Sequence, residues 1–242
     1  MIIEKVALWQ QAFGDSQEFI DGFFRSGYSQ DRCQFLEEDG RLAAILYWFD
    51  CLWNGRKVAY LYAVATDKAF RGQGLCRQLL ADTHRHLQSL GYDGAALVPG
   101  DAGLFQMYEK LGYRGFCPME RKSLLSGGAP VNLRTITPVE YAQLAKGWMP
   151  AGSVIPGAEM LTFYETYGQF YAFDGGCLCA AREKDTLYIQ EYLGDPAALP
   201  GIGAALGAET VQVRLPGKGM PFAMYHSFKE QAMPEYLGIA LD

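Results

Sequence analysis

The chain has 242 residues, 50% of them hydrophobic and 20% charged, with a net charge of −6 at pH 7. This length allows one or two domains, and the negative charge disfavours a nucleic-acid partner because phosphate backbones attract basic surfaces. The longest apolar runs, such as residues 42–49, are too short to span a bilayer, and the N-terminus lacks a signal-peptide pattern, so we expect a cytoplasmic protein without a membrane partner.

The N-terminal residues carry two helical patterns. Trp9 and Phe13 lie on the apolar side of a first helix. Asp15, followed three residues later by Glu18, gives an N-cap signal for a second helix. We therefore predict two helices before the first strand.

Three strand-like runs follow at residues 33–38, 42–49 and 57–66. They are separated by Asp39-Gly40 and Asn54-Gly55, which are strong signals for two-residue hairpin turns. The pattern predicts an antiparallel meander of three strands.

Residues 71–74 read Arg-Gly-Gln-Gly and lie directly before a helical pattern that ends near Gly91. The N-terminus of a helix has amides without intrahelical partners and a partial charge of roughly +0.5, which suits an anion. Gly72 and Gly74 have no Cβ, so the backbone can approach such an anion closely. The turn therefore predicts a phosphate or pyrophosphate site, with tight helix packing as the alternative. The helical spacing after it is kept by Leu75, Leu79, Leu80, Thr83 and Leu87.

Six cysteines show no repeating spacing. They are Cys33, Cys51, Cys76, Cys117, Cys177 and Cys179. The last two fit alternate positions of a strand better than a zinc knuckle. We predict reduced cysteines in the core and no metal site.

Two motifs resemble a known family. Residues 71–76 are similar to the R-x-x-G-x-G/A signature of the GCN5-related N-acetyltransferases, with Cys76 in place of the last small residue. Residues 101–113 resemble the second signature, N-x-x-A-x-x-L-Y-E-K-L-G-F, with Asp101 at the Asn position and Leu104 where Ala is usual. The match is clear from about residue 60 to residue 116.

The resemblance implies an α/β (α+β) fold with mixed, mostly antiparallel sheets flanked by helices. It also implies acetyl-CoA, or another acyl-CoA, as co-substrate, with the pyrophosphate on the amides of the glycine turn and the pantetheine arm along the strand before it. That strand is expected to splay from its parallel neighbour at residues 94–99. The residues that the resemblance assigns to acyl-CoA are Tyr62, Ala63, Val64, Thr66, Arg71, Gly72, Gln73, Gly74, Leu75, Cys76 and Asp101.

The implied reaction is direct attack of a neutral amine on the thioester. A lysine-like amine has a pKa near 10.4, so reaching its neutral form at pH 7 costs about 4.6 kcal/mol and calls for a base or a proton wire. Glu37, Glu38 and Glu109 are candidates by proximity, and a water chain is an equal alternative. Tyr108 matches the position from which the family protonates the leaving thiolate. The alternative role of Tyr108 is a core aromatic, because it shares a helical stripe with Leu104.

The sequence of residues 123–130, SLLSGGAP, indicates a linker, so we predict domains at 1–124 and 130–242. Thr137, Pro138 and Glu140 then form a capping box with proline at the first helical position. Strand-like runs at 168–193 repeat the meander. The second half resembles a degenerate copy of the first, as in tandem acetyltransferases that include the first two domains of the enhanced-intracellular-survival aminoglycoside acetyltransferases.

The phosphate turn has a poor counterpart in the second half. Residues 193–201, LGDPAALPG, bring an acid at Asp195, lose amide donors at Pro196 and Pro200, and contain no arginine. The glycines of residues 201–207 lack the spacing and the βαβ context of a dinucleotide loop. We predict one acyl-CoA site per chain.

The resemblance therefore predicts an acetyl-CoA-dependent N-acetyltransferase that acts on a small-molecule or peptide amine. A non-catalytic acyl-CoA-binding or sensing module is the alternative, and aminoacyl transfer by a related tandem fold is disfavoured by the intact glycine turn. Four aromatic residues fit either the acceptor cleft or the core: Trp48, Trp53, Tyr60 and Tyr62. The sequence leaves the oligomeric state open.

Overall fold

The computed structural model describes residues 2–229 and 232–241. The chain forms two compact units, and each is built from separated stretches of sequence. The first unit comprises Met1–Gly115, Ile155–Phe163 and Met224–Met233, and the second comprises Phe116–Val154, Tyr164–Ala223 and Pro234–Asp242. The predicted domains at 1–124 and 130–242 are continuous, so they differ from these units where two later segments belong to the first unit.

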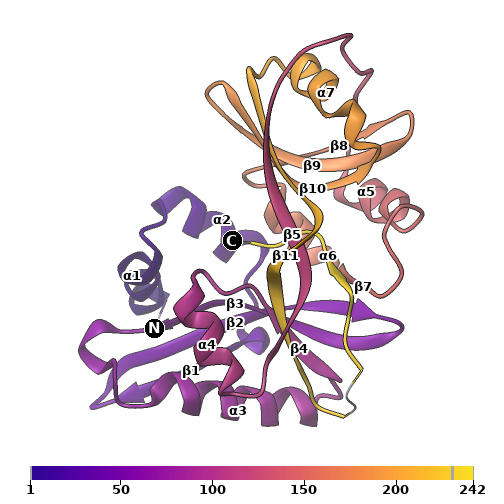
Figure 1. Cartoon of the computed structure of the whole chain (residues 1–242). Coiled ribbons are helices and arrows are strands. Elements are labelled where there is room, and N and C mark those ends of the chain that lie inside the picture. The colour runs from indigo at the N-terminus through magenta and orange to yellow at the C-terminus, as the bar shows by residue number, and fades with distance from the viewer. Residues whose placement is uncertain (1, 230–231, 242) are drawn as a thin grey trace. The chain divides into compact units, whose positions relative to one another are not determined.

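The first unit holds four helices, four strands and two short 3-10 turns from the first 115 residues (Figure 1). The helices are α1 (Ile2–Phe13), α2 (Gln17–Ser26), α3 (Leu75–Ser89) and α4 (Ala102–Glu109). The strands are β1 (Cys33–Glu38), β2 (Arg41–Trp53), β3 (Arg56–Thr66) and β4 (Gly94–Leu97). The 3-10 turns are η1 (Gln30–Arg32) and η2 (Lys68–Phe70).

The predicted meander is confirmed, since β1, β2 and β3 pair antiparallel in chain order. At both hairpin turns the residue before glycine also has a positive φ, 51° at Asp39 and 49° at Asn54. Paired positive φ angles define the turn type whose twist matches that of the flanking strands. The sheet continues with β4, parallel to β3, and with Met224–Ser227, antiparallel to β4.

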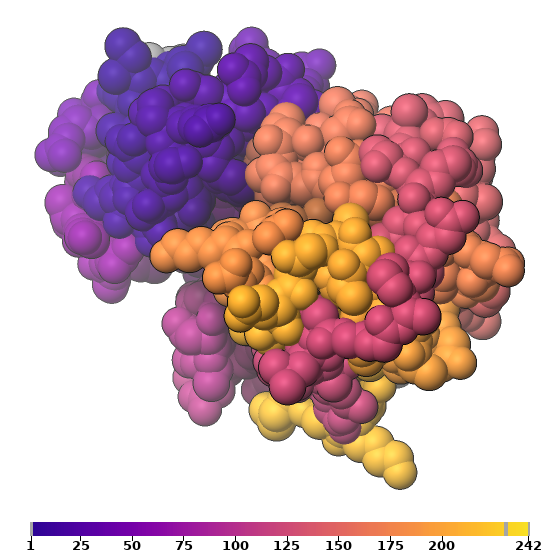
Figure 2. Space-filling model, turned by 90° about the horizontal axis from the view of Figure 1, so that it is seen from above, coloured from indigo at the N-terminus to yellow at the C-terminus, as the bar shows by residue number. Residues whose placement is uncertain are grey.

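The two faces of this sheet are covered by different helices. Helix α3 packs on one face in a core that includes Trp48 of β2 and Tyr108 of α4. Helices α1 and α2 cover the other face through an aromatic cluster, in which Trp9 and Phe23 approach Tyr47 with ring centroids 5.6 and 4.9 Å away. In Figure 2 the atoms of α1 and α2 (indigo) form part of the molecular surface.

The second helix begins one residue later than predicted. Ser16, not Asp15, is its N-cap, and the Ser16 hydroxyl accepts a hydrogen bond from the amide of Phe19. Asp15 instead accepts the indole N–H of Trp9 at 2.7 Å, which holds α1 against the start of α2. Phe13 is 46% exposed, so the apolar side of α1 is narrower than predicted.

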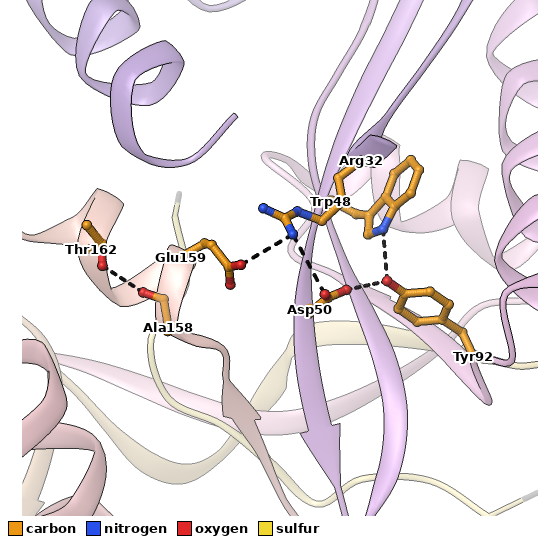
Figure 3. Close-up of polar contacts among 7 residues, drawn as sticks. All are labelled: Arg32, Trp48, Asp50, Tyr92, Ala158, Glu159 and Thr162. Atoms are coloured by element: carbon orange, nitrogen blue, oxygen red, sulfur yellow. Dashed lines mark hydrogen bonds and ion pairs between the residues drawn. The ribbon is translucent and has the colours of Figure 1, made fainter. Parts of the chain in front are cut away.

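The segment Ile155–Phe163 also belongs to the first unit. It includes the end of β7 (Ser153–Pro156), which pairs with β2, and most of α6 (Ala158–Tyr164). Figure 3 shows that Arg32 Nη1 lies 3.4 Å from Glu159 Oε1 and 3.8 Å from Asp50 Oδ2. Asp50 also accepts the hydroxyl of Tyr92, which in turn accepts the indole N–H of Trp48 at 3.2 Å. This network ties α6 to the meander.

The second unit repeats the order of a meander followed by a parallel pair. Strands β8, β9 and β10 pair antiparallel, and β10 pairs parallel with the start of β11. The capping box at Thr137 and Glu140 is confirmed, with Pro138 in the first turn. The helices of this unit are α5 (Pro138–Ala145) and α7 (Leu199–Ala205), with the 3-10 turn η3 (Pro196–Ala198). The strands are β5 (Arg114–Leu125), β6 (Arg134–Ile136), β8 (Gln169–Phe173), β9 (Gly176–Glu183), β10 (Thr186–Gly194), β11 (Thr210–Ser227) and β12 (Tyr236–Leu237).

Two strands are longer than the sequence pattern indicates. β5 runs on to Leu125, so part of the predicted linker is strand. β11 has 18 residues and passes through Pro216 and Pro221, where a loop was expected after Leu215. Both prolines lie outside the ladders with β10 and β4, so β11 needs no proline N–H there.

Five of the six cysteines are buried and Cys76 is half-buried, and all six are free thiols. Within the described residues, no helix combines the length and the apolar character needed to cross a bilayer. The same residues contain no group of three metal-ligating side chains.

Candidate active site

Strand β3 carries a bulge in its second half. Ala63 has a φ of +49°, a left-handed conformation that is uncommon for a residue other than glycine. The ladder with β2 shifts there, because Ala63 and Val64 together face the single residue Leu46. Bulges bend a strand and free backbone groups from the ladder, and they are enriched beside functional sites.

The parallel strands β3 and β4 form a fork beyond this ladder. They pair only over Val58–Tyr60 and Gly94–Ala96, while β3 continues to Thr66. Within the described residues, the β3 backbone beyond Leu61 therefore has no β4 partner on that side. The predicted pantetheine-contacting residues are half-buried members of this stretch: Tyr62, Ala63, Val64 and Thr66.

The glycine turn lies exposed between the fork and α3. Gly72 and Gly74 have φ angles of +79° and +83°, and no heavy atom lies within 4 Å of a Cβ built on either residue. Gly74 is the N-cap of α3 and provides no side-chain hydrogen bond to its first amides. Arg71 and Gln73 are exposed beside them, and Arg71 Nε donates to the carbonyl of Thr66 at 3.2 Å. The turn is therefore open ground in front of unpartnered helix amides.

Helix α3 is fixed by its apolar side, as its spacing predicts. The predicted inward residues are all buried: Leu75, Leu79, Leu80, Thr83 and Leu87. At the other end, Gly91 has a φ of +81°, and the amides of Gly91 and Tyr92 donate to Gln88 and Leu87. This is the glycine C-cap that the sequence predicts. Both anchors hold the N-terminus of α3, with Cys76 in its first turn, at the mouth of the fork.

Helix α4 carries Tyr108 and begins at Asp101. The Asp101 carboxylate accepts the amide of Leu104 at 2.9 Å, so in this structure it caps the helix. Tyr108 is 5% exposed and packs edge to face against Tyr113 at 5.4 Å. Among the described residues, its hydroxyl has no hydrogen-bond partner.

Burial, reinforced by the nearby Cys76 thiol, raises the pKa of Tyr108 above its ordinary value of 10. Burial also raises the pKa of Cys76. Both groups therefore stay neutral at pH 7, and Tyr108 is available as a hydrogen-bond donor that keeps its proton until a stronger base forms beside it.

The remaining predicted residues separate into core and surface. Trp48, Trp53 and Tyr60 are at most 4% exposed and belong to the core, whereas Tyr62 is half-buried and lies 5.5 Å from Trp9 between ring centroids. Of the candidate bases, Glu37 and Glu109 are exposed and Glu38 is half-buried. Nothing in their surroundings singles out one of them.

A buried cluster behind Tyr108 was not predicted. His84 Nε2 lies 2.7 Å from the hydroxyl of Tyr113, and the His84 ring stacks on His226 at 4.5 Å. Burial, reinforced by His226, lowers the pKa of His84 to about 3, so its ring is neutral at pH 7. His84 falls among the inward residues of α3, but no local pattern brings His226 of β11 to it.

The site offers three groups that fit an acyl-CoA. The open turn and the first amides of α3 suit a diphosphate. The free edge of β3 suits an arm that contains amides, and Tyr108 offers a neutral hydroxyl. A Cβ at Gly72 or Gly74 would occupy the space in front of the amides, which fits the need for glycine at both positions.

The comparisons agree with this geometry. Residues 2–116 match the family model described as an acetyltransferase (GNAT) domain. A GCN5-related N-acetyltransferase from Kribbella flavida has a TM-score of 0.70 and 16% identity, covering 93% of this chain and 68% of that one. Another from Anabaena variabilis has a TM-score of 0.68 and 14% identity, covering 90% of this chain and 68% of that one. No curated protein matches the chain.

A tandem GNAT protein from the clavulanic acid biosynthesis pathway has a TM-score of 0.57 and 12% identity, with 95% of each chain covered. At these identities the likeness to solved structures concerns the fold, while the family model identifies the N-terminal part. Through residues 2–116, the chain belongs to the GCN5-related N-acetyltransferase superfamily.

Proposed function

We propose that the chain is an acetyl-CoA-dependent N-acetyltransferase that transfers the acetyl group to an amine of a small molecule or peptide. One observation carries the proposal: the open glycine turn, the β3–β4 fork and Tyr108 all occur in one compact unit, the first. Acyl-CoA supplies the activated acyl group when it is bound.

The chain's own residues divide the work. The amides of residues 72–76 hold the diphosphate, because these positions combine the start of α3 with two glycines of positive φ. The backbone of β3 from Tyr62 to Thr66 aligns the pantetheine arm as an added strand would. Tyr108 holds a proton at its hydroxyl for the departing sulfur, and its raised pKa makes this help a hydrogen bond that matures into proton transfer.

We also propose that the second unit is a degenerate copy of the first and binds no acyl-CoA. Its strand order supports a copy, since a meander precedes a parallel pair in both units. At its turn, Asp195 already accepts the amide of Ala197 at 2.9 Å, and Pro196 and Pro200 lie at the helix starts.

The test is turnover of acetyl-CoA by the full chain with a panel of amines, measured as thiol release. The panel should span α-amines with a pKa near 7.8 and lysine-like amines near 10.4, because about 1 and 4.6 kcal/mol are needed for their neutral forms at pH 7. Calorimetric titration of the same preparation with acetyl-CoA should give about one equivalent per chain.

Thiol release that depends on the amine, together with one bound equivalent, is the expected result. Binding of one equivalent with no turnover of any amine would reassign the chain as an acyl-CoA-binding module. Two equivalents would contradict the account of the second unit.

A further inference from the structure

A pocket of about 360 Å³ lies within the second unit, on the surface of three neighbouring strands. β5 contributes Arg121 and Lys122, β10 contributes Tyr188, and β11 contributes Arg214 to its lining. Ligand sites in proteins commonly occupy roughly 300–1,000 Å³, so this pocket matches a small ligand.

The charge of the pocket opposes that of the chain. Its lining holds three cationic side chains and no carboxylate, whereas the chain as a whole has a net charge of −6. Cations gathered in a concave surface attract anions more strongly than scattered surface charges do.

Arg214 gives the pocket a fixed positive charge. Its residue is only 8% exposed, and its guanidinium carbon lies 4.3 Å from the centre of the Phe222 ring. Its Nη2 donates to the side-chain oxygen of Gln190 at 2.7 Å and lies 3.3 Å from the backbone carbonyl of the same residue. A guanidinium held in this way keeps its geometry before any ligand arrives, which lowers the entropy lost on binding.

The polar neighbours complete an anion site. Gln190 and Gln212 line the pocket with amide groups, and Tyr188 adds an aromatic ring with a hydroxyl. We propose that this pocket binds a small molecule that carries at least two negative charges on carboxylate or phosphate groups. The site is separate from the glycine turn at residues 71–76, so it adds a ligand to the proposed function.

Calorimetric titration of the full chain with citrate and with inorganic pyrophosphate tests the proposal, with saturating CoA present to block the first unit. The test variant is the double change Arg121→Gln and Lys122→Gln, because both side chains are exposed and contribute little to the fold. Lys146→Gln is the matched control, since Lys146 is an exposed cation of the same unit outside the pocket. Arg214→Lys keeps the buried charge but loses the fork-shaped group, and its thermal unfolding is followed alongside.

The expected result is one anion site in the presence of CoA, with affinity lowered by about tenfold or more in the double variant and within about twofold of wild type in the control. Binding of citrate alone would mark a carboxylate ligand, and binding of pyrophosphate alone a phosphate ligand. The proposal is overturned if neither anion binds up to about 10 mM, if CoA displaces both, or if the double variant matches the control.

Discussion

The first and second units contain the same strand arrangement but treat its opening differently. In the first unit, β3 and β4 separate after Tyr60, and an exposed turn with two open glycines follows. In the second, β10 and β11 separate after Ile189, and Arg214 bonds to Gln190 at that point. Tyr192 then donates its hydroxyl to the carbonyl of Asp195 at 2.6 Å. One fork presents its backbone outward, while the other uses its polar groups internally.

The difference teaches that topology alone does not make a cofactor site. A parallel pair that splits, with a bulge beside the split, occurs in both units. What differs is whether the backbone groups after the split have partners within the chain. The experiments below test that distinction, beginning with the largest expected effect.

Replacing Gly74 with valine should abolish acetyl-CoA binding measured by calorimetry. Valine disfavours a φ of +83°, and its side chain would stand in front of the first amides of α3. Gly40→Val is the matched control, because Gly40 has a φ of +71° and equally open surroundings in a hairpin turn. If the two variants retain equal affinity for acetyl-CoA, the first fork does not depend on its open turn.

Glu191 gives the second fork a pH dependence that the first lacks. Burial raises its pKa to about 7, despite hydrogen bonds from Tyr141 and Tyr236 and the positive charge of Arg214. Since the pKa in the unfolded chain is about 4.5, stability is highest below that pH and falls as the pH rises to about 7, by about 3 kcal/mol in total.

Urea unfolding of wild type and Glu191→Gln between pH 4.5 and 8 measures this effect. The amide stays neutral, so the variant should gain stability relative to wild type as the pH rises. Glu183→Gln, which changes an exposed carboxylate of β9, should follow the wild-type curve. Parallel curves for wild type and Glu191→Gln would mean that Glu191 titrates normally in the folded chain.

The helix after the split is the next point of contrast. β4 leads into α4 with Tyr108, whereas β11 continues without a helix within the described residues. Tyr108→Phe keeps the packing against Tyr113 but removes the hydroxyl, so kcat should fall roughly 10²-fold with little change in acetyl-CoA affinity. Steady-state kinetics together with calorimetry separates the two effects, and undiminished turnover would leave Tyr108 as a core aromatic.

The smallest effect is expected at the second turn. Asp195→Ala removes the acceptor for the amide of Ala197 and should cost about 1 kcal/mol of stability in denaturant unfolding. Asp195→Asn keeps an oxygen at that position and should cost much less. Equal losses in both variants would show that the carboxylate, and not the cap, matters there.

Local patterns predict most of the first fork. The two hairpin turns, the glycine turn and the inward residues of α3 each depend on neighbours within a few positions, and each appears where the sequence places it. The start of α2 was misplaced by one residue because Asp15 and Ser16 are both good N-caps, and the indole N–H of Trp9 takes the first of them. The binding roles of residues 62–76 and Asp101 stay predictions.

Long-range pairings were beyond such reasoning. A proline-rich stretch reads as a loop until its partners are known, and β11 becomes a strand across Pro216 and Pro221 because it pairs with different strands at its two ends. The burial of Arg214 and the stacking of His226 on His84 follow from the same strand. No residue near them in sequence signals either contact.

The path of β11 also has a consequence for how the protein is made. Residues 224–227 cover the edge of β4, yet they leave the ribosome long after residues 94–97. At roughly 5–20 residues per second, that edge stays unpaired for several seconds or more during synthesis. An exposed strand edge invites pairing with other chains, so nascent chains are vulnerable in this interval. The unit that begins first at the ribosome is therefore completed only when translation is almost finished.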